Sequence, residues 1–246
     1  MRAYKKDHAF GLRALKIMNS ELLKYPVLRD IKKLERGRVV QRARALKKKT
    51  VLLDVGCGLG EDMHAIKDEI NGGIFGIDIN PHAIEECVPH SKLRFLVMDA
   101  KQTAFPDSFF DVSFLTVNTL GNFDMEERFL WLSEMLRVSK CNLVSLYINT
   151  GNHEEMRIAD RLEYYKALCE SDDVVFDGIR FLSESAELNG RLFTIEEIEE
   201  MFKIYGIRFY EIQRLNEVLL MVRIMGQQIS DSPDLSKVDL LSWDME

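Results

Sequence analysis

The sequence predicts an α/β fold in which a mostly parallel β-sheet is covered by helices on both faces. After residue 50, short apolar runs of strand length alternate with amphipathic segments of helix length, as expected when parallel strands are joined by helices. A glycine-rich turn links the first apolar run to the first amphipathic segment. Near the C-terminus, two apolar runs flank a short polar turn, which predicts an antiparallel hairpin at one end of the sheet.

The elements of the first half follow from this alternation. Strands are expected where apolar residues cluster, over residues 50–55, 74–77, 93–98, 112–117 and 143–148. Helices are expected over residues 61–69, 81–87 and 126–138. The turn residues agree, because Asn80 and Pro81 place a proline at a helix start, and Asn71 with two following glycines is typical of a helix end.

The last third contains one further helix and the hairpin. Thr194 followed by two glutamates is typical of a capped helix start, and Gly206 is expected to end this helix. Its apolar face would comprise Ile195, Ile198, Met201, Phe202 and Tyr205. Strands are expected over residues 208–214 and 218–225, followed by an acidic tail of low order over residues 226–246.

Charge is distributed unevenly along the chain. Residues 1–50 hold 16 Lys and Arg against 4 Asp and Glu, whereas the remainder holds 17 against 36. This basic stretch could contact nucleic acid, or it could lie on the acidic body as a lid. We favour a helical lid over residues 1–49, since apolar residues recur there at roughly helical spacing: Leu28, Ile31, Leu34, Val39, Ala43 and Leu46.

Composition argues against several classes of protein. No apolar run approaches the roughly 20 residues needed to span a bilayer, and the N-terminus lacks the apolar stretch of a signal peptide. We therefore expect a cytoplasmic protein. The four cysteines form no CxxC pair and the five histidines show no metal-binding spacing, so we expect no metal site.

The strongest chemical signal is the segment VLLDVGCGLG at residues 51–60. An apolar strand ends in Asp54, and Gly56, Gly58 and Gly60 then alternate before a helix. Glycines there allow a sharp turn and let a ligand approach main-chain N–H groups at a helix N-terminus. Such a turn alone is compatible with either a dinucleotide or another nucleoside ligand.

The residue at position 61 separates these two interpretations. A dinucleotide fingerprint GxGxxG read from Gly56 requires a glycine at position 61, where this chain has Glu61. A carboxylate there would repel a pyrophosphate. S-adenosylmethionine (SAM) has no phosphate and carries a sulfonium and an ammonium, so an acidic neighbourhood suits it better.

These residues resemble the class I SAM-dependent methyltransferase superfamily, especially its small-molecule branch. The resemblance covers roughly residues 48–148 and rests on DVGCGLG, GIDIN at 76–80, FLVMDA at 95–100 and FPDSFFDVSFLTVN at 105–118. It implies a Rossmann-like, seven-stranded sheet within a SAM-binding domain that extends over residues 50–225. The implied cofactor-binding residues are Asp54, Gly56, Cys57, Gly58, Gly60, Asp78, Ile79, Asp99, Ala100 and Asn118.

The resemblance also implies roles for the acids. Asp54 would hold the methionine ammonium, Asp78 both ribose hydroxyls, and Asp99 the adenine amino group, while the Ala100 N–H could reach a ring nitrogen. A lone aspartate at a strand end is often only a turn or cap residue. Three at successive strand ends agree better with a ligand, which open α/β sheets bind outside those ends. Cys57 is expected to be a small turn residue, not a nucleophile.

The methyl acceptor is less well specified. The segment after the fourth strand lacks the NPPY-type motif of enzymes that methylate base amines, and it offers neutral polar groups instead. An insertion over residues 149–193 is expected to build the acceptor pocket. The acceptor-side candidates are Asn118, Thr119, Asn122, Tyr147, His153 and Tyr164, with Glu154 and Tyr165 as further suggestions. Asn122 could merely make a turn and Tyr165 could be core. Tyr147 and His153 are also candidates for a general base by position.

Three functions remain open at this point. The leading hypothesis is methyl transfer from SAM to a small-molecule acceptor, with S-adenosylhomocysteine (SAH) as product. Tyrosines beside carboxylates would suit an amine. The alternatives are an RNA methyltransferase that grips phosphates with the basic segment, and a non-catalytic SAM-binding subunit.

Overall fold

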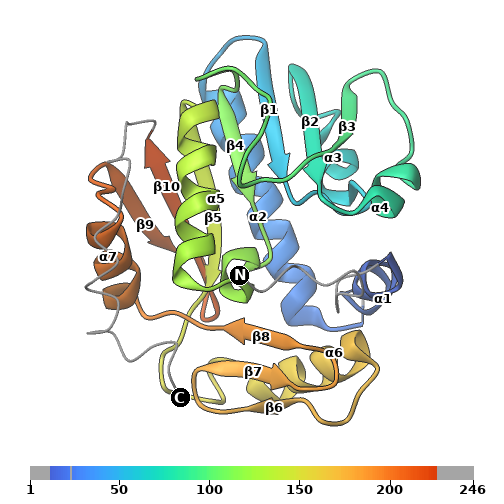
Figure 1. Ribbon diagram of the computed structural model, residues 1–246, viewed down its shortest axis with the longest axis vertical. Coiled ribbons are helices and arrows are strands. Elements are labelled where there is room, and N and C mark those ends of the chain that lie inside the picture. Colours follow the sequence, from blue (N-terminus) through green and yellow to red (C-terminus); the bar gives the residue numbers. More distant parts are fainter. Residues whose placement is uncertain (1–11, 23, 226–246) are drawn as a thin grey trace.

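The main sheet has seven strands in the order β3-β2-β1-β4-β5-β10-β9, in a computed structural model that describes residues 12–22 and 24–225 (Figure 1). The neighbouring pairs from β3 to β5 are parallel, whereas β10 is antiparallel to both β5 and β9. The strands are β1 (Thr50–Val55), β2 (Gly72–Asp78), β3 (Leu93–Val97), β4 (Val112–Leu115), β5 (Cys141–Tyr147), β9 (Tyr210–Arg214) and β10 (Leu219–Met225). The predicted mostly parallel sheet with an antiparallel C-terminal hairpin is confirmed.

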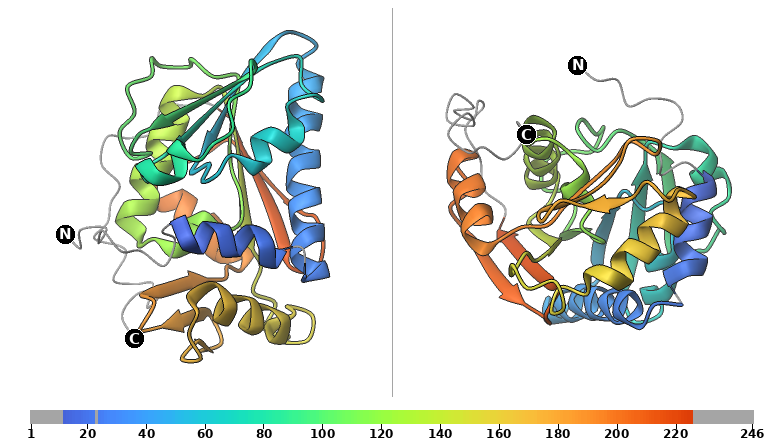
Figure 2. Two further views of the ribbon diagram at one scale, coloured as in Figure 1. Left: turned by 90° about the vertical axis from the view of Figure 1, so that its right-hand side faces the viewer. Right: turned by 90° about the horizontal axis from the view of Figure 1, so that it is seen from below.

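Helices cover both faces of this sheet, as predicted (Figure 2). On one face, α2 (Pro26–Ala45) and α3 (Glu61–Ile66) bury apolar side chains against β1, β2 and β4. On the other face, α5 (Met125–Val138) and α7 (Ile195–Ile204) pack against the strands and against each other. A short α4 (Pro81–Glu85) follows β2, and Asn80 caps it by accepting hydrogen bonds from the His82 and Ala83 N–H groups.

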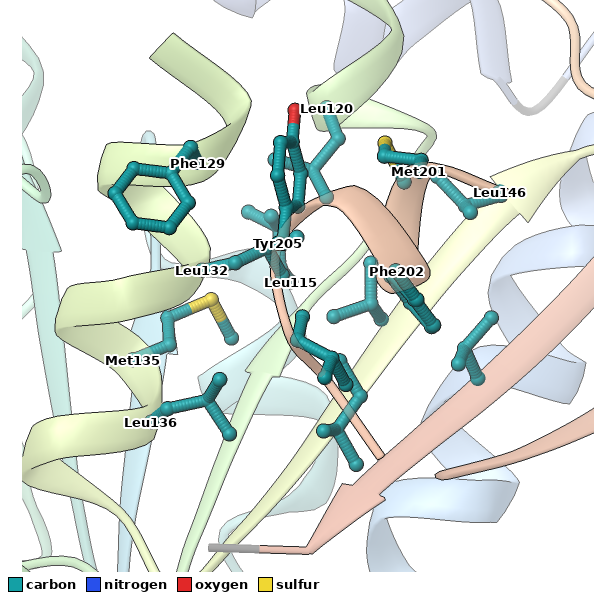
Figure 3. Close-up of a cluster of buried hydrophobic side chains, with 14 of the residues drawn as sticks. Leu115, Leu120, Phe129, Leu132, Met135, Leu136, Leu146, Met201, Phe202 and Tyr205 are labelled. Carbon is teal, nitrogen blue, oxygen red and sulfur yellow. The ribbon is translucent and has the colours of Figure 1, made fainter. Parts of the chain in front are cut away.

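The core between α5 and α7 is well packed (Figure 3). Leu132 of α5 and Phe202 of α7 are at most 1% exposed, as is Leu146 of β5. Tyr205, at the end of α7, is fully buried and its hydroxyl donates to the Met125 carbonyl over 2.6 Å. Thr194 starts α7 with a complete capping box, as its sequence predicts.

The predicted insertion forms a separate layer below the carboxyl ends of the strands (Figures 1 and 2). It contains α6 (Ile158–Cys169) and a three-stranded antiparallel sheet, which the sequence analysis did not predict. The strands of this sheet are β6 (Val175–Phe176), β7 (Arg180–Ser183) and β8 (Leu188–Arg191). The N-terminal α1 (Leu12–Leu22) packs beside α6, and a short 3-10 turn η1 (Thr119–Asn122) touches β8.

Several predicted boundaries were wrong. The fourth strand ends at Leu115 and not at residue 117, because Val117 and Asn118 adopt left-handed backbone angles, with φ of 59° and 56°. The first helix after the glycine turn ends at Ile66 and not at residue 69. Gly72 belongs to β2 and not to a helix end. Glycine is required there because a Cβ would lie 1.8 Å from the Thr50 carbonyl oxygen of the adjacent strand.

Two predicted segments lie at the ends of the chain. The predicted acidic tail at residues 226–246 lies outside the described residues, as do residues 1–11 of the predicted lid. Across residues 12–22 and 24–225, none of the helices has the length and apolarity that crossing a membrane requires.

Candidate cofactor and acceptor site

The glycine turn follows β1 directly and has the backbone conformation that its sequence predicts. Gly56, Gly58 and Gly60 all have positive φ angles, of 70°, 53° and 76°, which side-chain-bearing residues rarely adopt. The Gly56 and Cys57 N–H groups both donate to the Ile77 carbonyl, over 2.8 and 2.9 Å. These hydrogen bonds hold the turn at the end of β2, next to Asp78.

Asp78 ends β2 and holds the turn with its carboxylate. Its Oδ2 accepts a hydrogen bond from the Gly58 N–H over 2.9 Å, and its Oδ1 accepts one from the Asn80 N–H over the same distance. Burial raises the pKa of Asp78, while these backbone donors act in the opposite direction. Asp78 thus has a structural role that the sequence analysis did not assign to it.

Asp54 lies deeper, at the end of β1, and is only 3% exposed. Within the described part of the chain, its carboxylate accepts no hydrogen bond from a side chain or turn, although it lines the central cavity. Burial and the neighbouring Asp62 carboxylate raise its pKa well above the usual range. A buried carboxylate without a donor is costly, so this oxygen pair is suited to receive a cation from a ligand.

A cavity of about 880 Å³ opens at the carboxyl ends of the parallel strands. It lies where the strand order reverses between β1 and β4, the usual ligand position in open α/β sheets. Of the predicted residues, it is lined by Asp54, Gly56, Cys57, Gly58, Asp78, Ile79, Asp99, Ala100, Thr119, Asn122, Tyr147, Tyr164 and Tyr165. The structure therefore brings most of the predicted cofactor and acceptor residues into one cavity.

Four predicted residues do not line it. Gly60 starts α3, and a Cβ there would lie 2.4 Å from the Phe95 ring. Asn118 is 2% exposed and acts from behind the cavity wall. His153 packs against the Phe176 ring at 5.4 Å, and Glu154 lines a different, polar cleft. The amine hypothesis therefore loses the carboxylate that Glu154 was to supply.

The tyrosines of the insertion are also part of its core. Tyr165 is 7% exposed and stacks on Phe181 at 4.7 Å, so the expectation that it is a core residue holds together with its place in the cavity wall. Burial and Glu35 raise the pKa of the Tyr147 phenol well above its usual range. This makes Tyr147 a poor general base at neutral pH.

The cysteine of the turn has no feature of a nucleophile. Burial and the Asp54 carboxylate raise the pKa of the Cys57 thiol well above its usual range. A thiol is reactive only as thiolate, so the expectation that Cys57 is a small turn residue is consistent with its surroundings. Among the described residues, no group of three or more His, Cys, Asp or Glu side chains could hold a metal ion.

The sequence analysis missed a charged cluster on the cavity wall beside α2. Asp62 of α3 accepts hydrogen bonds from Lys32 Nζ over 2.6 Å, Arg36 Nε over 2.8 Å and Thr116 Oγ1 over 3.0 Å. Burial raises the pKa of Asp62, but the two cations outweigh burial and lower that pKa to about 2. Lys32 also lines the cavity. Lys32 is one of many cations in the basic N-terminal segment, so the neighbouring sequence did not indicate this role.

The N-terminal helix α1 covers part of the cavity. Its residues Leu12, Arg13, Leu15 and Met18 line the cavity, and Leu15 lies over the glycine turn. Arg13 pairs with Glu170, which directly follows α6, and Lys16 pairs with Glu86, which directly follows α4. All four side chains of these pairs are at least 42% exposed, so the pairs contribute little stability.

Comparison with known proteins agrees with this geometry. Residues 52–142 match the family described as methyltransferase domain. A 2-methyl-6-phytyl-1,4-hydroquinone methyltransferase from Synechocystis is 30% identical over 95 residues, which are 37% of this chain and 29% of that relative. The chain thus matches less than a third of the length of this curated relative.

Solved structures share the fold at low sequence identity. A SAM-dependent methyltransferase from Methanosarcina mazei has a TM-score of 0.52 at 21% identity, covering 84% of this chain and 99% of that one. The Burkholderia thailandensis 1,6-didemethyltoxoflavin-N1-methyltransferase has a TM-score of 0.54 at 14% identity, over 86% and 88% of the two chains. The magnesium protoporphyrin IX methyltransferase from Synechocystis, solved with SAH, also has a TM-score of 0.54 at 14% identity, over 82% and 88%. Residues 52–142 of this chain therefore match the methyltransferase domain family, and the chain shares its fold with solved SAM-dependent methyltransferases.

Proposed function

We propose that this protein transfers a methyl group from SAM to a small, largely apolar acceptor. The observation that carries the proposal is a single cavity that joins three strand-end acids to an aromatic wall from the insertion. SAM supplies an activated methyl group, and its transfer requires alignment and exclusion of water more than a catalytic side chain.

The cavity residues fit the chemical groups of SAM. Asp54, a buried carboxylate without a donor, suits the methionine ammonium. Lys32 lines the cavity with an ammonium that has two further donors beside its contact to Asp62, which suits the methionine carboxylate. Asp78 has lone pairs left for the ribose hydroxyls. The half-exposed Ile79 would pack on the adenine, with Asp99 and Ala100 at its polar edge.

The acceptor end of the cavity is mainly aromatic and apolar. Tyr147, Tyr164, Tyr165 and Leu168 line it, together with Met18 of α1. These side chains favour a flat or apolar small molecule over a highly charged one. Because burial raises the pKa of the Tyr147 and Tyr165 phenols and His153 lies elsewhere, the acceptor would react through a lone pair that is already free. An uncharged amine, a ring nitrogen and an ionised oxygen all satisfy this requirement.

The basic segment supports the lid hypothesis better than the RNA hypothesis. Lys32 and Arg36 pair with Asp62, Arg44 pairs with Glu69, and Lys48 pairs with Asp111. Cations that are engaged with the body are less available to phosphates. Within the segment, α1 covers the cavity, whereas α2 is part of the core and has Ile31 and Val39 at 1% exposure.

The proposal is tested in two steps. Calorimetric titration with SAM and SAH should give saturable binding to the full chain. Amine, carboxylate, hydroxyl and RNA acceptors are then screened for incorporation of a labelled methyl group, and a small-molecule acceptor is expected to be labelled. Labelling of RNA that is lost at high salt would favour the RNA hypothesis. Binding of SAM without transfer to any acceptor would favour the non-catalytic subunit, and no binding of SAM or SAH would refute all three.

A further inference from the structure

The loop that follows β4 has a strained backbone where it lines the cavity. Thr116, Val117 and Thr119 all line the cavity. Val117 and Asn118 have consecutive positive φ angles of 59° and 56°. A β-branched residue rarely adopts this conformation, and such strain persists only where the surroundings enforce it.

A carboxylate from the N-terminal segment holds this loop on one side. Glu35 of α2 is fully buried, and its Oε1 accepts hydrogen bonds from the Val117 N–H over 2.8 Å and from Ser145 Oγ over 2.5 Å. These partners lie 82 and 110 residues away in the sequence. Glu35 thereby ties α2 to the loop and to β5 at the same point.

An amide holds the loop on the other side. Asn118 Nδ2 donates to the Arg191 carbonyl over 2.7 Å, and Asn118 Oδ1 accepts from the Tyr147 N–H over 2.9 Å. Gly121 makes room for this contact, because a Cβ there would lie 2.3 Å from Asn118 Nδ2. The strained pair at 117 and 118 is thus held from two sides, by Glu35 and by Asn118.

Packing alone does not account for a carboxylate at position 35. Glu35 continues the buried row of α2 at four-residue spacing, between Ile31 and Val39, where an apolar side chain would fit the pattern. Its second oxygen, Oε2, is buried without a hydrogen-bond partner within the described residues. Burial raises the pKa of Glu35, with Lys32 opposing and Asp62 reinforcing that effect, so the group is unfavourable in isolation.

We propose that Glu35 is a positioning residue that fixes residues 116–118 against the methyl-transfer site by accepting the Val117 N–H bond. This role rests on the proposed function, which assigns the loop to the methyl-transfer site. The bond itself does not depend on the proposed function. The basic N-terminal segment is then an internal part of the site as well as its cover.

Two variants separate the hydrogen bond from the charge. Glu35→Gln keeps an acceptor oxygen for Val117 and removes the charge, whereas Glu35→Met keeps the volume and removes the acceptor. The readouts are the deuterium-exchange rate of the Val117 amide in the full chain, the affinity for SAH and the thermal midpoint. Val40→Ala is the matched control, since Val40 is a buried residue of α2 that packs in a different apolar cluster from Val117.

In Glu35→Met, the Val117 amide should exchange at least about tenfold faster and SAH should bind about tenfold more weakly. The thermal midpoint should change little, because relief from a buried carboxylate with a free oxygen offsets the loss of the acceptor for Val117 and Ser145. Glu35→Gln should restore the exchange rate to near that of the unsubstituted protein. Val40→Ala should lower the midpoint without a selective change at Val117.

Three results would overturn the proposal. Unchanged exchange at Val117 in Glu35→Met would show that the bond does not hold the loop. Equal effects of Glu35→Gln and Glu35→Met would show that the charge, and not the acceptor, matters. A lower midpoint with faster exchange throughout α2 would make Glu35 merely structural. If the unsubstituted protein did not bind SAH, the proposed function would fail while the exchange data would still test the bond.

Discussion

Asp78 allows a direct test of where the cofactor ribose binds. Its carboxylate accepts one hydrogen bond from Gly58 and one from Asn80, each of 2.9 Å, and an ionised carboxylate has about four lone-pair sites. Two sites therefore remain for the ribose hydroxyls. Hydrogen bonds to charged groups contribute about 1.5–3 kcal/mol, so Asp78→Ala should weaken SAH binding roughly tenfold to a hundredfold.

Weaker binding alone would be ambiguous, since Asp78→Ala also removes the contact that holds the glycine turn. A double-mutant cycle resolves this by comparing SAH with an analogue that lacks the ribose 2′-hydroxyl, both measured by calorimetry. If Asp78 binds the ribose, the analogue should bind the unsubstituted protein more weakly, and the penalty of Asp78→Ala should be clearly smaller for the analogue, because one of the two hydroxyl contacts is already missing. An equal penalty for both ligands would refute the ribose assignment and leave Asp78 as a turn residue only.

Three further predictions concern stability. Because Lys32 and Arg36 lower the pKa of buried Asp62 from 3.8 to about 2, its contribution of about 2 kcal/mol is fully present above pH 3.8 and is lost as the pH falls toward 2. The free energy of unfolding in urea should therefore fall more steeply between pH 5 and pH 2 for the unsubstituted protein than for Asp62→Asn. Parallel pH curves for the two proteins would contradict the stabilising role of ionised Asp62. Gly76→Ala should lower the free energy of unfolding by about 1–3 kcal/mol in the same assay, because the new Cβ would lie 2.4 Å from the Met63 sulfur; an unchanged midpoint would mean that the neighbours yield freely. Arg161→Met should raise the thermal midpoint, since the buried guanidinium has two nitrogens without partners; a clear decrease would show that its stacking on a tyrosine ring at 4.3 Å outweighs burial.

The features that the sequence predicted well are local ones. The glycine turn, the cap at Thr194 and the proline at the start of α4 each depend on neighbours within a few residues, and all are present. The cavity acids were predictable because Asp54 and Asp78 end adjacent parallel strands, which places them at one edge of the sheet.

The features that it did not predict depend on distant contacts. Val117 reads as a strand residue by type, but the carboxylate of Glu35, 82 residues earlier, supports a left-handed conformation there. The strands of the insertion are two to four residues long, too short for an alternating pattern to stand out. The role of Lys32 in the cavity wall could not be predicted, because its partner Asp62 lies 30 residues away in the sequence.

The insertion of residues 149–193 leaves and rejoins the main domain at one point. Ile148 and Phe193 form a parallel bridge, the Phe193 N–H donates to the Tyr147 carbonyl over 2.8 Å, and the Asn149 N–H donates to the Phe193 carbonyl over 2.7 Å. With its two ends fastened side by side, the segment can change in length or sequence at little cost to the sheet that carries the cofactor residues. On the proposed function, grafting a different segment between Ile148 and Phe193 would exchange the acceptor-side wall of the cavity and leave the main sheet in place.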